Sequence, residues 1–350
     1  MSFRIGPIEI KSPVVLAPMA GVTDLAFRLV VRSFHEGLSC AEMVSSQSLV
    51  HAKSRKKYLL RFDPRDTPTS VQILGRDASL MAEAAKILED MGAQAIDINM
   101  GCSVRKVLKQ REGSALLREP EVAGAVMKAV VKAVTLPVTL KMRMGFSEDP
   151  KRALLFSKIA EDSGIAALAV HGRTIEQGFS GKADWEIVAQ VKNTVAVTVI
   201  GNGDVKTPPD AATRMRESGC DAVMIGRGAM GNPWLLRNAA RACLGLAHEE
   251  PATEEKFPVM LRHIALAREL AGESSASKTI RKHLVWYLKG MPLASRMRDL
   301  IFHQNSCNGL VALIEKYRDY ISGLNGRPEA EIPHPRELAE RFESSMGVNA

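Results

Sequence analysis

The chain has 350 residues, of which 46% are hydrophobic and 25% charged. This length and balance are typical of a globular protein with one large α/β domain and a smaller second domain. The formal net charge of +8 favours a polyanionic partner without requiring one.

Two classes of protein are excluded at this stage. No apolar run approaches the roughly 20 residues of a membrane span, and the N-terminal stretch "MSFRIGPIEIKSP" lacks the pattern of a signal peptide. The five cysteines are scattered, with no Cys-x-x-Cys pair and no Cys/His cluster, which argues against a disulfide framework or a zinc site. We therefore expect a cytoplasmic protein with no membrane partner and no metal.

Apolar, β-branched runs recur along the first two thirds of the chain, with amphipathic segments between most of them. Runs that are hydrophobic throughout predict strands buried on both faces, as in a parallel sheet. Glycines end several of the intervening segments, as expected for helix C-caps. The eight predicted strands are 14–20, 40–46, 69–75, 95–101, 137–145, 167–173, 196–204 and 222–230. Eight such units predict an α/β fold, a (β/α)8 TIM barrel, over residues 1–243.

The pattern changes after the eighth unit. Residues 244–256 are short, acidic and proline-containing, which is typical of a linker. Residues 257–324 show helical periodicity without strand signals and predict a C-terminal all-helical bundle domain. Residues 325–350 are polar and predict a tail or a short helix.

Polar side chains gather where the predicted strands end, which is where barrels of this kind place their chemistry. Lys141, in the middle of "PVTLKMRMG", is the most informative, because a buried cation is costly unless it meets an anion or an electron-rich group. Taken singly, Lys141 could reach solvent and His171 could be an ordinary core residue, but the size of the set favours a site. Its members are Met19, Ala20, Gln72, Asn99, Cys102, Lys141, Arg143, His171, Arg173, Asn202, Asp204 and Arg227.

Glycine-rich ends follow the last two predicted strands, "GNGD" and "GRGAMG". Glycines there let backbone N–H groups approach a phosphate. The second stretch also spells G-x-G-x-x-G, but it belongs to the eighth barrel unit and no parallel strand with an acidic ribose ligand follows. A phosphate cradle is therefore the better interpretation than a dinucleotide fold.

With these motifs in view, the sequence resembles the tRNA-dihydrouridine synthases, most of all their bacterial B-type branch. The resemblance runs through "APMAGVTD", "VQILG", "DINMGC", "PVTLKMRMG", "HGRT", "GNGD" and "MIGRGAMGNPW", and continues into "RKHLVWYLKG". It implies a non-covalently bound FMN and NADPH as the electron donor. By position, the residues implied to contact the cofactor are Pro18, Met19, Ala20, Gln72, Lys141, His171, Asn202, Gly203, Asp204, Gly226 and Arg227.

The reaction that the resemblance implies is reduction of the uracil C5–C6 double bond in tRNA. Hydride would pass from the flavin N5 to C6, and the cysteine after Met-Gly, here Cys102, would protonate C5. An ordinary thiol is mostly protonated at neutral pH and can donate this proton. The target uridine must leave its stack to reach a barrel mouth, and Asn99 is expected to hydrogen-bond it.

Cations near the predicted site suit an RNA backbone, which basic side chains bind without reading sequence. The expected RNA contacts are Arg105, Lys106, Lys109, Arg173, Arg281 and Lys282. The segment "KSRKKYLLR" (53–61) adds five further cations and could instead be a solvated face. His283 and Tyr287 could stack on RNA or pack in the helical domain, and packing is favoured. We expect the protein to act as a monomer.

The substrate side departs from the family pattern at two places. Ser103 replaces the usual proline after the cysteine, so the loop is expected to be more mobile. Arg111 and Glu112 stand where small residues are usual, and Glu112 is unfavourable near RNA phosphates unless Arg111 pairs with it. Two other functions therefore stay open: a flavin barrel that reduces a small pyrimidine, and an RNA-binding protein that keeps the flavin fold without turnover.

Overall fold

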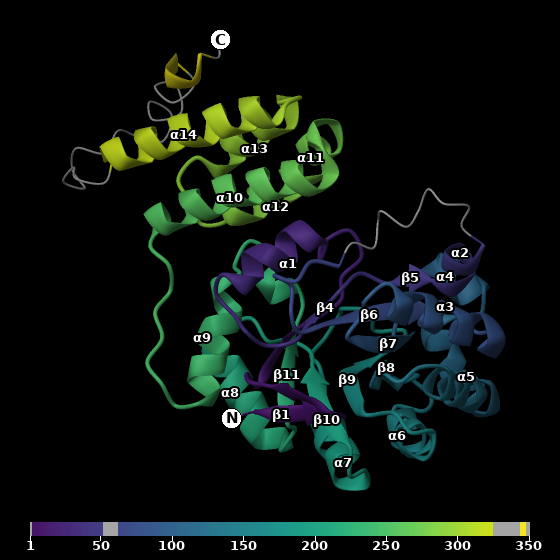
Figure 1. Cartoon of the computed structure of the whole chain (residues 1–350). Helices are drawn as coiled ribbons and strands as arrows, with labels where there is room; N and C mark the ends of the chain where they lie inside the picture. Colours follow the sequence, from purple (N-terminus) through teal and green to yellow (C-terminus); the bar gives the residue numbers. More distant parts are fainter. Residues whose placement is uncertain (1, 52–61, 325–343, 348–350) are drawn as a thin grey trace. The chain divides into compact units, whose positions relative to one another are not determined.

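The computed structural model describes residues 2–51, 62–324 and 344–347 (Figure 1). The cation-rich segment 53–61 and most of the predicted tail lie outside these residues. The chain divides into two compact units. The first comprises Met1–Ala229 and Leu235–His248, and the second comprises Met230–Trp234 and Glu249–Ala350.

Parallel strands of the first unit form a closed eight-stranded barrel (Figure 1). Each strand pairs with the next along the chain, and β11 pairs with β3 to close the ring. In ring order the strands are β3 (Val14–Leu16), β4 (Ser39–Cys40), β6 (Thr69–Leu74), β7 (Ala95–Met100), β8 (Val138–Gly145), β9 (Ala167–Thr174), β10 (Thr198–Asn202) and β11 (Ala222–Ile225). A further short strand, β5 (Val44–Ser45), also pairs with β6. The predicted TIM barrel is confirmed.

Helices surround the barrel and cover its outer face with a continuous apolar layer. They are α1 (Leu25–Arg32), α2 (Ser46–Val50), α3 (Ala78–Asp90), α4 (Arg105–Lys109), α5 (Pro120–Ala133), α6 (Arg152–Asp162), α7 (Glu186–Thr194), α8 (Pro208–Ser218) and α9 (Trp234–Cys243), with the 3-10 turns η2 (Gly113–Arg118) and η3 (Arg227–Ala229). Local sequence sets several ends. Thr207 and Asp210 form a capping box at the start of α8, and Gly219 ends it with a φ of 64°.

Several predicted strands are shorter than the apolar runs suggested; the eighth, for example, ends at Ile225 and not at residue 230. β3 ends at Leu16, because the chain turns after Ala17 and Met19 donates its N–H to Thr23 Oγ1 at 2.9 Å. The second strand is interrupted, so that residues 41–43 separate β4 from β5. These differences arise at the carboxyl end of the strand, where a barrel chain leaves the sheet to form its loops.

A hairpin at the N-terminus went unpredicted. Its strands β1 (Phe3–Ile5) and β2 (Ile8–Ile10) pair antiparallel. Phe3, Ile5 and Ile10 are buried in the same apolar cluster as Ala167 and Ile200, which face the barrel interior. The hairpin therefore closes the end of the barrel at which the strands begin, and leaves the opposite end for a site.

In its described residues the second unit contains helices only. They are α10 (Thr253–Ala271), α11 (Glu273–Thr279), α12 (Arg281–Tyr287), α13 (Ala294–His303) and α14 (Cys307–Leu324). The first of them starts four residues before the position expected from the sequence, inside the segment interpreted as a linker. Buried Phe257 of α10 meets Tyr317 of α14 edge-on, with ring centroids 5.7 Å apart. None of the described helices has both the length and the apolar character that a membrane crossing needs.

Candidate functional site

The predicted site residues converge inside the barrel because they alternate along strands that are in register. Asn99 of β7 lies beside Lys141 of β8, and Arg143 of β8 lies beside His171 of β9. His171 in turn lies beside Asn202 of β10. Since side chains two residues apart on a strand share a face, these polar groups face the interior near the carboxyl ends of the strands.

Cys102 follows β7 and is held by hydrogen bonds on both sides. Its N–H donates to Asn99 Oδ1 at 2.9 Å, and its carbonyl accepts from the N–H and the hydroxyl of Ser114 at 3.0 and 2.9 Å. Gly113 has a φ of 61°, and a Cβ there would lie 2.8 Å from the Cys102 carbonyl oxygen. The side chain of Cys102 stays partly exposed. Ser114 and Gly113 thus anchor the residue despite the serine that replaces proline at position 103.

The Asn99 side chain is engaged inside the protein. Its Oδ1 accepts from the N–H groups of Gly101 and Cys102, and its Nδ2 donates to Gln72 Oε1 at 2.6 Å. Gln72 Nε2 in turn donates to buried Asp97 at 2.6 Å. In this arrangement the side chain that was expected to bind the target base supports the Cys102 loop.

Lys141 is the cation most available for a ligand. In the part of the chain that the structure describes, its ammonium makes no hydrogen bond and no ion pair. Burial and the neighbouring Arg143 lower its pKa to about 8, against the opposing effect of Asp97. The side chain therefore carries a positive charge at neutral pH without a fixed partner, which suits an electron-rich or anionic ligand.

His171 is neutral at physiological pH. Burial lowers the pKa of its imidazole to about 2, and four cations add to the effect, Lys141 first and then Arg143, Arg173 and Arg227. Its Nε2 accepts a long hydrogen bond from Arg173 Nη1 at 3.4 Å. A neutral imidazole next to several cations marks a region of positive potential inside the barrel mouth.

Arg173 was expected to contact RNA, and its position does not fit that role. The residue is 1% exposed. Its Nη2 donates to both carboxylate oxygens of Asp204 at 2.7 and 2.6 Å and to the carbonyl of Gly181 at 2.7 Å, while Nε donates to Ser180. Sequence reasoning could not show this, because the partners come from 7 to 31 residues further along the chain. Arg173 holds the loop after β9 to the end of β10.

The Asp204 carboxylate completes this anchor. It also accepts from the N–H of Ala183 at 2.8 Å, and its backbone is left-handed with a φ of 52°. Burial alone would raise the pKa of Asp204, but the hydrogen bonds from Arg173 and Ala183 bring it below the usual value. Asp204 thus stays ionised and organises the loop that follows β10.

Glycines and Arg227 form the neighbouring part of the rim. Gly203 has a φ of 135°, and a Cβ there would come within 2.5 Å of Ala183 and 3.4 Å of the His171 ring. A Cβ on Gly226 would lie 3.6 Å from Met19 Sδ. The exposed Arg227 guanidinium stacks on Phe179 at 4.1 Å from the ring centroid. Residues that directly follow β3, β10 and β11 therefore form this part of the rim.

Comparison with known proteins agrees with this arrangement. The profile of the dihydrouridine synthase (Dus) family matches residues 15–321. The chain belongs to the dihydrouridine synthase family. The oxidoreductase class and family expected from the motifs are confirmed.

Related family members span nearly the whole chain. A probable tRNA-dihydrouridine synthase of Rickettsia bellii is 40% identical over 93% of this chain and 99% of its own length. The tRNA-dihydrouridine synthase B of Xanthomonas axonopodis pv. citri is 39% identical over 93% and 98%, and that of Pseudomonas syringae pv. tomato is 41% identical over 85% and 88%. The expected likeness to the B-type branch is confirmed.

A more distant likeness to solved structures supports the fold alone. Histamine dehydrogenase from Rhizobium sp. 4-9 superimposes with a TM-score of 0.54 at 12% identity, over 76% of this chain. This dihydrouridine synthase family member spans 50% of the dehydrogenase chain. A barrel architecture is thus shared at a level where sequence similarity has been lost.

On the predicted RNA side, the three cations after Cys102 are available. Arg105, Lys106 and Lys109 lie on α4 and are all exposed. Arg111, in contrast, pairs with Glu119 at 2.9 Å and not with Glu112. Burial raises the pKa of Glu112, which lowers the share of its charged form.

Arg281, also expected to contact RNA, is engaged within the second unit. Its guanidinium donates to the carbonyl of Phe302 at 3.1 Å and to the carbonyl of Gln304, at the end of α13. These contacts satisfy carbonyls that a helix C-terminus leaves open. Arg281 therefore fixes the end of α13, and Lys282, which is partly exposed, is the better candidate for an RNA contact.

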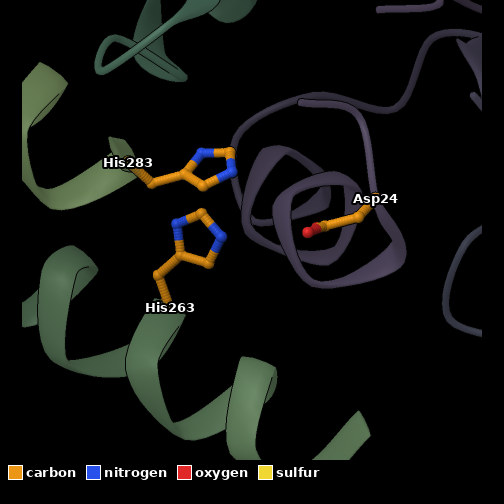
Figure 2. Close-up of side chains that lie close together, drawn as sticks. All are labelled: Asp24, His263 and His283. Carbon is orange, nitrogen blue, oxygen red and sulfur yellow. The ribbon is translucent and has the colours of Figure 1, made fainter. Parts of the chain in front are cut away.

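His283 and Tyr287 pack in the helical domain, as favoured from the sequence, since each is 1% exposed. Figure 2 shows the rings of His283 of α12 and His263 of α10 next to each other; their centroids are 4.6 Å apart and their planes are tilted by 59°. His263 Nδ1 also lies 3.2 Å from the Tyr287 hydroxyl. Asp24, the third residue labelled in Figure 2, belongs to the first unit, where it caps α1 by accepting from Phe27 N–H.

Sequence reasoning missed several residues of the site. Asp97 and Thr139 lie on the same inward faces as Asn99 and Lys141, two residues earlier on each strand. That spacing was a usable signal, since a carboxylate inside a buried strand needs a partner. Ser114 and Phe179 had no such signal, because each depends on the course of a loop.

Proposed function

We propose that this dihydrouridine synthase family member reduces the C5–C6 double bond of uridines in tRNA to dihydrouridine, with FMN as bound cofactor and NADPH as electron donor. The observation that carries the proposal is Cys102, held by Asn99 and Ser114 at the barrel mouth near the charged Lys141, which has no ion-pair partner among the described residues. A proton donor and a cation for an electron-rich ring are the two groups that such a reduction needs.

The residues present fit FMN. Lys141 offers a cation with no fixed partner among the described residues, and the pKa of neighbouring His171 is lowered first by burial and then by the cations around it. Arg227 and the backbone at Gly203 and Gly226 would hold the phosphate end, and Lys141 with Met19 would line the ring end. When bound and reduced by NADPH, FMN supplies hydride to C6 of the uracil.

The chain's own groups perform the remaining tasks. The Cys102 thiol donates its proton to C5, and the hydrogen bonds to its N–H and carbonyl keep the thiol in place. Lys141 stabilises negative charge that develops next to it. The target uridine must be extruded to reach these groups, while Arg105, Lys106 and Lys109 neutralise phosphates of the surrounding RNA.

The proposal is tested with purified protein. We expect it to bind FMN, to oxidise NADPH and to form dihydrouridine in undermodified tRNA far faster than in free uridine. Equal rates on both substrates would favour the small-pyrimidine reductase, and a protein that takes up no FMN would leave only the RNA-binding function. Light scattering of the purified protein checks the expected monomer.

A further inference from the structure

Four side chains form a hydrogen-bonded chain across three neighbouring strands. Thr139 Oγ1 donates to Asp97 Oδ1 at 2.5 Å, Gln72 Nε2 donates to Asp97 Oδ2 at 2.6 Å, and Asn99 Nδ2 donates to Gln72 Oε1 at 2.6 Å. Asp97 is the strand neighbour of both Gln72 and Thr139. All four residues are at most 7% exposed, so water does not compete for these bonds.

The donor-to-acceptor direction of these hydrogen bonds is fixed at both ends of the series. Asp97 Oδ2 accepts the hydrogen bond from Gln72, so it requires the NH2 group of Gln72 to face it. The oxygen of Gln72 then faces Asn99 and requires the NH2 group of Asn99. At the other end, the N–H groups of Gly101 and Cys102 can only donate. Both donate to the single side-chain oxygen of Asn99, Oδ1, at 3.1 and 2.9 Å.

We propose that Asp97 is a positioning residue that sets the amide orientation of Gln72 and Asn99 and thereby holds the backbone of Cys102 in place. A reversed Asn99 would direct its NH2 group at the N–H of Cys102, and that hydrogen bond would be lost. The consequence for catalysis rests on the proposed function, whereas the effect on Cys102 itself does not.

Burial makes the hydrogen bonds of Asp97 costly to lose. It raises the pKa of Asp97, while the hydrogen bonds from Thr139 and Gln72 and the charge of Lys141 oppose the rise. A carboxylate removed from water in this way is costly unless its oxygens are satisfied. Both oxygens accept hydrogen bonds from side chains, Oδ1 from Thr139 and Oδ2 from Gln72. Gln72 is in turn bonded to Asn99, which holds the backbone of Cys102.

The test is the alkylation rate of Cys102 by iodoacetamide, followed by peptide mass spectrometry without RNA or NADPH. In Asp97→Leu, which removes the acceptor, we expect Cys102 to react about five times faster, the factor that corresponds to one lost hydrogen bond of about 1 kcal/mol. Asp97→Asn is the matched control. Its oxygen can still face Gln72 while its NH2 group donates to the Thr139 hydroxyl, so its rate should stay within about twofold of the wild type.

Three outcomes overturn the inference. Equal alkylation rates of Cys102 in the wild type and Asp97→Leu would show that the hydrogen-bonded chain of side chains does not hold Cys102. A rise in Asp97→Asn as large as that in Asp97→Leu would show that acceptor polarity is not the cause. Faster alkylation of Cys220 and Cys243 as well would indicate a general loosening of the barrel.

Two further measurements keep the test decisive. If Asp97→Leu does not fold, Gln72→Leu breaks the same chain one link later, and the same rise at Cys102 is expected, with an unchanged rate again contradicting the inference. In folded Asp97→Leu, dihydrouridine formation should fall by a larger factor than NADPH oxidation does. A wild-type protein that forms no dihydrouridine would refute the proposed function and leave the alkylation result standing.

Discussion

Replacing Lys141 by methionine is expected to stabilise the flavin-free protein. The pKa of Lys141 falls from 10.5 to about 8, chiefly through burial. A shift of that size corresponds to about 3 kcal/mol that the native state loses by holding the charge. Because the side chain keeps part of its exposure, we expect a gain of about 2 kcal/mol in the free energy of unfolding at pH 7 for Lys141→Met.

The pH dependence has a definite sign. Between pH 8 and 10.5 the unfolded chain holds the proton of Lys141 and the native chain does not, so the stability of the wild type rises with pH in this window. The methionine variant lacks this rise. Its advantage should therefore be complete below pH 8 and should shrink by about 1.4 kcal/mol per pH unit above it.

Urea unfolding of the flavin-free proteins at pH 7 and pH 9 measures both effects. Lys128, exposed on α5, provides the control, since Lys128→Met should change the stability by less than about 0.5 kcal/mol at either pH. With FMN present the wild type should be the more stable of the two proteins, because Lys141→Met binds the flavin more weakly. A Lys141→Met protein that is less stable than the wild type at pH 7, or whose advantage is the same at both pH values, would refute the reasoning.

Four further substitutions separate chemistry from structure. Cys102→Ala should retain FMN and NADPH oxidation but lose dihydrouridine formation by a factor of about 100 or more, measured in single turnovers; equal product would refute its role as the acid. Arg173→Met should lower the free energy of unfolding by about 2–3 kcal/mol, because it removes charge-assisted hydrogen bonds to the partly exposed carboxylate of Asp204, and denaturant titration checks this. Arg281→Ala should lower the free energy of unfolding by about 1–2 kcal/mol. Lys282→Ala should leave stability unchanged but lower the slope of log K for RNA binding against log salt concentration by about one. The opposite pattern would show that Arg281, and not Lys282, contacts RNA.

The barrel was predictable because each of its strands is buried on both faces. Runs such as residues 69–75 and 95–101 agree within one residue with β6 and β7. The N-terminal hairpin was not predictable in the same way, since its strands have three residues each and carry too little pattern to stand out. Its place is set by packing against residues far along the chain, such as Ala167 and Ile200.

Within the site, the sequence indicated which residues gather but not what each one contacts. Lys141 and His171 lie inside the barrel, as alternation along a strand requires. Arg173 follows the same alternation, yet its burial depends on Asp204 and on the loop that contains Gly181. The sequence likewise indicates a surface cation at Arg281, whereas in the structure its guanidinium binds the end of α13. A sequence shows which side chains are charged, but not which group each charge contacts in the folded protein.

The central claim is that this protein makes dihydrouridine in tRNA. Mapping dihydrouridine in RNA from cells with and without the gene tests it most directly, with restoration by the wild-type gene and by the Cys102→Ala variant compared in the same background. We predict that specific tRNA positions lose dihydrouridine without the gene, that the wild type restores them and that Cys102→Ala does not. An unchanged map, or full restoration by Cys102→Ala, would contradict the proposed reaction.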